Sequence, residues 1–152
     1  MPRILICLLA LLFSMSSPAT EGNADFRQSS LAAEGVATPY GTAVQATTAE
    51  ARAALTEVQN GATVYRQGQF GVQNTADAQF WSLSNPATTP GYAGRLGMPG
   101  GAATPDWMMG GQVPSGASVI TRGAPGIGVN AGGSLEAVVP PGGVQINWFH
   151  MP

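Results

Sequence analysis

The sequence predicts an α+β fold built from two small, mostly antiparallel sheets with a few short helices. The chain has 152 residues, enough for one domain of ordinary size. Glycine and proline contribute 21 and 12 residues, which favours turns over long helices. The β-prone runs are short and gather late in the chain, where turn residues separate them, so antiparallel neighbours are expected.

The first nineteen residues have the layout of a secretory signal peptide. In "MPRILICLLALLFSMSSPA", Arg3 precedes the apolar run Ile4–Phe13, and a small-residue region follows, which predicts secretion with cleavage after Ala19. The run is too short for a stable membrane anchor, and the alternative, a buried N-terminal helix, lacks an amphipathic stripe. Cys7 is the single cysteine, so the mature chain is expected to contain none. Residues 20–46 are polar and unpatterned, which predicts a flexible linker.

A helix is expected to lead into the main domain over residues 47–60. Thr47 followed by Glu50 fits a capping box, and Asn60 before a glycine is a helix stop, so the helix is predicted over 48–59. Its apolar positions share one face, which is expected to pack on the domain body: Ala51, Ala54, Leu55 and Val58.

Residues 61–152 are expected to form the main domain. "ATVYRQG" is β-branched and aromatic, which predicts a strand ending near Arg66. "NTADAQFWSLSNP" has an alanine-rich centre before a proline, which predicts a helix of about two turns with Phe80 and Trp81 near its end. A second short helix is expected to begin at Pro90 in "TTPGYAGRLGMPGG". Four further strands are predicted in "DWMMGGQV", "ASVITR", "LEAVV" and "VQINWFH".

The acidic, arginine and histidine side chains of this domain are few, and this excludes several kinds of site. They are Asp77, Asp106, Glu136, Arg66, Arg95, Arg122 and His150. One histidine with scattered acids makes no zinc site, and calcium needs clustered oxygen ligands, so no metal is expected. A net charge of −2 argues against nucleic-acid binding. Composition leaves a Ser-His-Asp arrangement open, but no nucleophile-elbow pattern is present and His150 is interpreted as a frayed tail residue.

Arg66 and Glu136 remain as the candidates for a small-molecule site. An arginine presents a planar fork to phosphate or pyrophosphate. The glycine-rich loop before Glu136 lets backbone approach a ligand, and a glutamate beside a sugar supports an oxocarbenium-like centre. Tyr65, Phe80 or Trp81 could stack on a flat base. The alternative is a strand-end arginine, aromatic core residues and a purely structural loop.

Four segments in order carry a resemblance to a known family. "ATVYRQGQFG", "AQFWSLSNP", "GYAGRLGMP" and "VITRGAPGIGVNAGGSLEAVVPPGGV" resemble the TreTu family, the ADP-ribosyltransferase toxin domains found at the C-termini of bacterial polymorphic toxins, which act on the elongation factor EF-Tu. The last segment is more distantly similar to the tuberculosis-necrotizing-toxin group of NAD glycohydrolases. The resemblance covers residues 61–152, although this chain begins with an apparent signal peptide and family members usually end a long delivery protein.

The resemblance implies an ADP-ribosyltransferase fold whose cleft holds NAD as substrate. It implies that Glu136 is the catalytic acid and that Arg66 grips the NAD phosphates. The other expected NAD-binding residues are Tyr65, Phe80, Trp81, Arg122 and Asn130. The expected function is that of a secreted toxin-like mono-ADP-ribosyltransferase that modifies a target protein, with EF-Tu as one candidate and an immunity protein as a further partner. An NAD glycohydrolase and a non-enzymatic secreted binding module stay open as alternatives.

Overall fold

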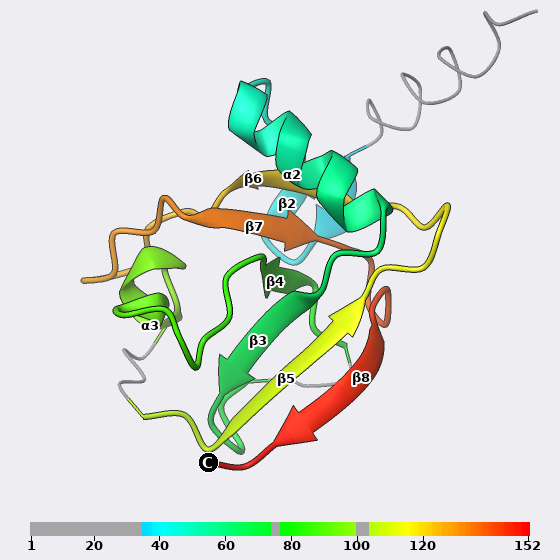
Figure 1. The fold of residues 1–152 in the computed structure, drawn as a ribbon. Helices are drawn as coiled ribbons and strands as arrows, with labels where there is room; N and C mark the ends of the chain where they lie inside the picture. The colour runs from blue at the N-terminus through cyan, green and yellow to red at the C-terminus, as the bar shows by residue number, and fades with distance from the viewer. Residues whose placement is uncertain (1–34, 74–76, 100–103) are drawn as a thin grey trace, which may run out of the picture.

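The computed structural model describes residues 35–73, 77–99 and 104–152, and these form a mostly β structure with few helices (Figure 1). A two-stranded and a six-stranded antiparallel sheet account for the strands, which confirms the predicted α+β class. The predicted signal peptide and Cys7 lie outside the described residues. No helix in the described part of the chain is long and apolar enough to cross a membrane.

The larger sheet consists of two three-stranded halves. Its strand order is β6-β7-β4-β3-β5-β8. β3 pairs with β5 at five residue pairs but with β4 only at Tyr65 and Ser82, so the two halves meet at one pair. The strands are β3 (Val64–Gly68), β4 (Phe80–Ser82), β5 (Trp107–Gln112), β6 (Ile120–Gly123), β7 (Leu135–Val138) and β8 (Gln145–His150).

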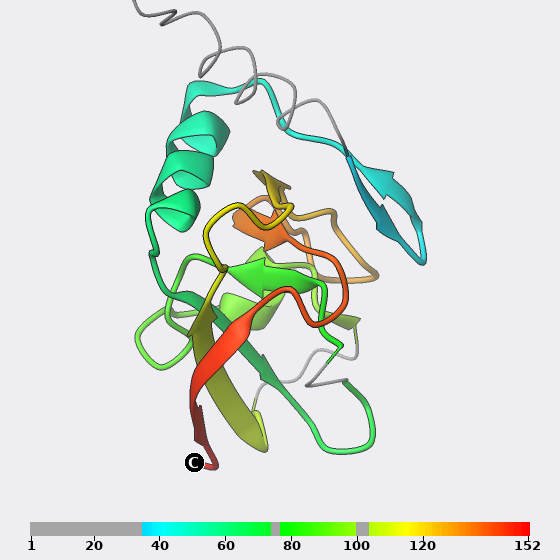
Figure 2. The ribbon, with the colours of Figure 1, turned by 90° about the vertical axis from the view of Figure 1, so that its right-hand side faces the viewer.

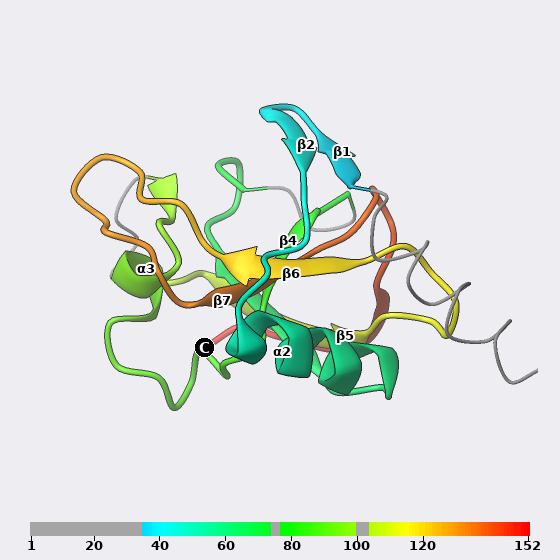
Figure 3. The same cartoon turned by 90° about the horizontal axis from the view of Figure 1, so that it is seen from above.

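Helix α2 (Ala49–Gln59) covers one face of the half formed by β6, β7 and β4 (Figure 3). The predicted helix is confirmed, and so is its buried face of Ala51, Ala54, Leu55 and Val58. The capping residue is Thr48 rather than Thr47, because the Thr48 side chain accepts a hydrogen bond from the Ala51 amide at 3.2 Å. The core beneath α2 contains Val64, Trp81, Trp107, Met109 and Ala137.

A hairpin packs on the opposite side of the same half, as Figures 2 and 3 show. It consists of β1 (Val36–Thr38) and β2 (Gly41–Ala43). Val36 and Ala43 are buried against Ile120 and Val138. The prediction of a flexible linker over 20–46 is therefore wrong for this stretch. Its turn, "TPYG", carries proline and glycine where tight turns use them, and Gly41 adopts a φ of 104°.

The other expected elements are confirmed except for one helix. "AQFWSLSNP" contains strand β4 instead of a helix, because Trp81 enters the core under α2 while its neighbours Phe80 and Ser82 face the other side. A run this short does not distinguish the two periodicities. Helix α3 (Tyr92–Arg95) is present but begins two residues after Pro90, following Gly91. His150 is no frayed tail residue, since it ends β8 opposite Met108.

Candidate functional site

A cavity of about 550 Å³ opens beside the junction between the two halves of the large sheet. Its polar lining includes Arg66 from β3, Ser82 from β4, Glu136 from β7 and Arg122 from β6. Apolar side chains complete much of the wall: Tyr40, Phe80, Trp81, Leu96, Met98, Pro125 and Ile127. The structure therefore brings Arg66 and Glu136, 70 positions apart in the sequence, to one cavity.

Three of the polar residues form a row across adjacent strands. Glu136 lies opposite Ser82 on β4 and opposite Arg122 on β6. Directly paired residues of antiparallel strands point to the same face, which places all three side chains together. The Arg122 Nε donates a hydrogen bond to Oε1 of Glu136 at 2.9 Å, so this arginine orients the carboxylate.

Glu136 is the one buried carboxylate residue among those that the structure describes. Burial raises the pKa of its carboxyl above the ordinary value, while the hydrogen bond and charge of Arg122, and the charge of Arg66, oppose that rise. The side chain is 6% exposed and Arg122 is 28% exposed. A carboxyl at a cavity wall with opposing influences of this kind is typical of functional sites.

Arg66 presents a partly unsatisfied guanidinium to the same cavity. Its Nη1 donates to the Phe80 carbonyl oxygen at 2.6 Å, while the buried Nε has no hydrogen-bond partner. Because the β3–β4 ladder ends after a single pair, the arginine occupies the position where a neighbouring strand would otherwise pair with that carbonyl. Burial lowers the pKa of Arg66, and electrostatic interactions with Tyr92 and Glu136 oppose the change. A cation that lines a cavity and has no ion-pair partner among the described residues is suited to bind an anion.

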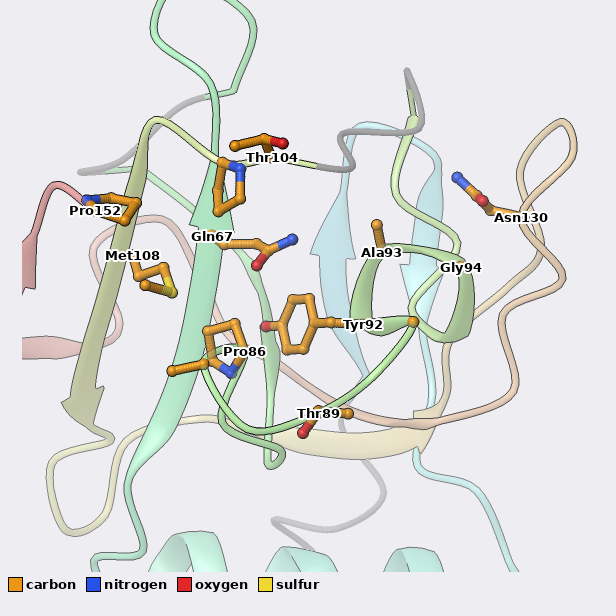
Figure 4. A pocket seen from close by; sticks show the side chains of 13 residues that line it. Gln67, Pro86, Thr89, Tyr92, Ala93, Gly94, Thr104, Met108, Asn130 and Pro152 are labelled. Atoms are coloured by element: carbon orange, nitrogen blue, oxygen red, sulfur yellow. The ribbon is translucent and has the colours of Figure 1, made fainter.

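A second cavity of about 480 Å³ adjoins the first, and Figure 4 shows its lining. The two cavities share Gln67 and Tyr92. The Tyr92 hydroxyl points toward β3 and donates to the Tyr65 carbonyl oxygen at 3.2 Å. Burial raises the pKa of Tyr92, so this phenol stays neutral. Sequence reasoning missed Gln67, Ser82 and Tyr92, which carry no motif and become neighbours only through strand pairing.

The glycine-rich loop after β6 forms one wall of the first cavity and is held against the segment around α3. Gly132 and Ser134 donate backbone hydrogen bonds to the carbonyls of Gly94 and Arg95, at 2.9 and 3.0 Å. The side-chain amide Nδ2 of Asn130 donates a hydrogen bond to the Met98 carbonyl oxygen at 2.6 Å. Glycine is required at 132, where φ is 70° and a Cβ would collide with the backbone of residues 124–125. The glycines thus shape the loop, while Pro125 and Ile127 line the cavity.

The structure brings most of the sequence-predicted residues to this site, but not all. Arg66, Phe80, Trp81, Arg122 and Glu136 line the first cavity. Trp81 is largely a core residue, 2% exposed, with its Nε1 donating to the Ala78 carbonyl.

Two predicted residues lie elsewhere. Asn130 lines the second cavity instead of the first. Tyr65 lines neither described cavity; its ring lies 6.2 Å from that of Trp148, because the two side chains share one face of the β3-β5-β8 half. The position of Tyr65 therefore does not support ligand contact through its ring.

Comparison with known proteins adds no family to this geometry: no family model, curated protein or solved structure matches the chain. Within the described ranges, no three His, Cys, Asp or Glu side chains group together as metal ligands. The chemical interpretation of the site therefore rests on its own residues.

Proposed function

We propose that this protein is an NAD-dependent mono-ADP-ribosyltransferase, a toxin-like enzyme that cleaves NAD and transfers ADP-ribose to a target protein. The observation that carries the proposal is the convergence of Arg66 and Glu136 on one cavity. Ligand cavities of about 300–1,000 Å³ are typical for small molecules and cofactors. The adjoining cavity extends the available space beyond Gln67 and Tyr92 to Pro86 and Met108, as an elongated dinucleotide requires.

Arg66 is the proposed phosphate contact. Its side chain lines the cavity, forms no ion pair with any described residue, and makes a hydrogen bond through Nη1 alone. A pyrophosphate would supply the countercharge and further acceptors to this guanidinium in a partly dehydrated setting, where charge-assisted hydrogen bonds are strong. Binding at this point orients the nicotinamide ribose toward the far wall of the cavity.

Glu136 is the proposed catalytic carboxylate. Cleavage breaks the bond between the ribose anomeric carbon and the nicotinamide nitrogen, and nicotinamide leaves with the bonding electron pair. Positive charge then develops on the ribosyl group, and a nearby carboxylate stabilises it more than it stabilises the ground state. The acceptor nucleophile forms the new bond to that carbon and loses its proton to solvent or a neighbouring base.

Arg122 acts on Glu136 rather than on NAD in this proposal. The hydrogen bond from Arg122 fixes one carboxylate oxygen, Oε1, and opposes the effect of burial on the carboxyl pKa. Ser82 is the paired neighbour on the other side. The second carboxylate oxygen, Oε2, has no described hydrogen-bond partner and is therefore the atom available to a ribose hydroxyl.

The division of the large sheet into two halves supports an ADP-ribosyltransferase fold, in which two sheet portions enclose NAD. Arg66 comes from one half, and Glu136 from the other. Together with the sequence resemblance to the TreTu family, this arrangement leads us to propose EF-Tu as a candidate target and an immunity protein as a partner. Secretion through residues 1–19 stays a prediction.

The test compares the full chain with its Glu136→Gln and Glu57→Gln variants, using NAD labelled in the adenylate moiety and a cytosolic acceptor preparation. Glu57 is an exposed glutamate on α2, which makes it the matched control. We expect Glu136→Gln to lose about a hundredfold or more of the rate of nicotinamide release, and Glu57→Gln to match the wild type.

The position of the label then distinguishes the reactions. Label on protein supports transfer, and label recovered only as free ADP-ribose means that the chain is an NAD glycohydrolase. A wild-type chain that neither binds nor consumes NAD would contradict both activities and leave the binding-module alternative.

A further inference from the structure

The hairpin β1–β2 ends in an aromatic side chain at the edge of the first cavity. Tyr40 is 86% exposed, yet it lines the cavity that contains Arg66 and Glu136. Its ring centroid lies 6.2 Å from that of Phe80, with 41° between the ring planes. The two rings form an aromatic corner, and most of the Tyr40 ring is open to a ligand.

The turn that carries Tyr40 is ordered by its own hydrogen bonds. The Thr38 hydroxyl donates to the Gly41 carbonyl at 2.7 Å and accepts from the Tyr40 amide at 3.2 Å. The proline ring restricts φ at position 39, directly before Tyr40, and Gly41 adopts the positive φ that closes the turn. A polar residue would serve such an exposed turn equally well, so the turn itself does not explain an aromatic ring at position 40.

The base of the hairpin is fixed to the strands that carry the site. The side-chain amide Nε2 of Gln79 donates a hydrogen bond to the Ala37 carbonyl oxygen at 2.8 Å. After β2, the Gln45 side chain accepts from the Thr121 amide at 2.8 Å, and the Ala46 amide donates to the Thr121 carbonyl at 3.1 Å. The two bonds to Thr121 attach the hairpin to β6 next to Arg122, and the bond from Gln79 attaches it to the start of β4. Tyr40 is thus held in place before any ligand arrives, which lowers the entropic cost of a contact.

We propose that Tyr40 is a ligand-binding residue that stacks on a planar heteroaromatic ring of the bound dinucleotide. This inference rests on the proposed NAD site and extends it to a residue outside the 61–152 segment on which the resemblance depends. An aromatic face attracts a flat base, and it attracts a cationic ring such as nicotinamide more strongly. Arg66 binds the phosphates in the same cavity, so the hairpin supplies the ring contact and β3 the charge contact.

The experiment measures binding without turnover, in the Glu136→Gln background of the full chain. Isothermal titration calorimetry with NAD compares this parent protein, which retains Tyr40, with its Tyr40→Phe and Tyr40→Ala variants. Val129→Ala is the matched control, because Val129 is 97% exposed and lines neither described cavity. We expect Tyr40→Ala to weaken NAD binding about tenfold and the other two variants to bind as the parent does. Melting temperatures without ligand should agree among all four proteins, because the Tyr40 side chain is exposed.

Two shorter ligands identify the ring. ADP-ribose lacks nicotinamide, and nicotinamide mononucleotide lacks adenine. A tenfold loss that appears with ADP-ribose assigns the adenine ring to Tyr40, and a loss that appears with the mononucleotide assigns the nicotinamide ring; either result supports the proposal.

Equal affinities of Tyr40→Ala and the parent for NAD would overturn the stacking role while leaving the proposed enzyme intact. An equal loss in Tyr40→Phe would also overturn it, since the ring is retained there. If the parent binds none of the three ligands, the proposed function fails, and the role of Tyr40 falls with it.

Discussion

Replacing Arg66 with methionine separates a structural arginine from a phosphate-binding one. The substitution removes the hydrogen bond from Nη1 to the Phe80 carbonyl, and an unsatisfied buried carbonyl costs about 1–3 kcal/mol. It also relieves the burial of a cation that has no ion-pair partner among the described residues, a penalty of several kcal/mol per ion in proteins. Attraction to Glu136 offsets part of that penalty. The opposing contributions leave the free energy of unfolding within about 2 kcal/mol of the wild-type value.

The response to NAD is where the two proteins should differ. A ligand present at 100 times its dissociation constant stabilises the folded state by about 2.7 kcal/mol. We expect the wild type to gain this amount and Arg66→Met to gain nothing at the same NAD concentration. Urea unfolding with and without NAD measures both quantities on the full chain. Arg52→Met, on the exposed side of α2, is the matched control and should respond to NAD as the wild type does.

Two results would refute this reasoning. If Arg66→Met loses about 4 kcal/mol or more without ligand, the guanidinium mainly holds the β3–β4 junction together. If the variant gains as much stability from NAD as the wild type, Arg66 is not the phosphate contact. The second result leaves the carboxylate Glu136 without a binding partner for the dinucleotide and removes the main support for the enzyme.

Three further predictions concern the charge and packing of the same structure. Burial raises the pKa of Glu136, so folding disfavours the charged form of its carboxyl. The melting temperature of the wild type should therefore fall relative to that of Glu136→Gln as pH rises from 4 to 7. A difference in melting temperature that stays constant between these pH values would contradict the assignment. Gly97→Ala should lose at least about 1 kcal/mol in urea unfolding, because φ is 57° and the new Cβ would collide with the Pro125 carbonyl oxygen; an unchanged midpoint would show that the loop adjusts freely. Met109→Ala, at 1% exposure, should lose about 2–5 kcal/mol and Phe149→Ala, at 47% exposure, much less; similar losses would place the core elsewhere.

The sequence predicted the elements whose signals are local. The helix Ala49–Gln59 has a stop and an apolar face within one stretch, and both appear in the structure, while its cap is Thr48 and not the predicted Thr47. The late strands are separated by turn residues and were equally well defined. β4 is not predictable from the sequence, because three residues are too few to show a strand or helix periodicity and their conformation depends on strand pairing and core packing. The hairpin β1–β2 is not predictable either, because only its turn residues distinguish it from a linker.

The candidate site could be predicted only in part, because it is assembled by strand register. Arg66 and Glu136 are identifiable from the sequence, because the chain has few charges and the patterns for metal and nucleic-acid sites are absent from it. Their approach depends on β7 pairing with β4 and β4 pairing with β3, which no spacing in the sequence indicates. The same is true of Ser82, whose neighbour lies 54 positions later, and of Tyr40, which reaches the cavity from the segment expected to be a linker.

The placement of charge in this fold is the physical argument for a function at the cavity. Charged residues make up only 9% of the chain, and the described part has five carboxylate residues, of which four are exposed. The fifth, Glu136, is buried beside Arg122, and Arg66 lines the same cavity. Buried ionised groups contribute little to stability, and apolar side chains of similar volume often serve a core at least as well. The chain carries few charges, yet it places a buried Glu136 and the half-buried Arg66 and Arg122 at one cavity. This placement supports the proposal of a ligand that needs both a cation and a carboxylate.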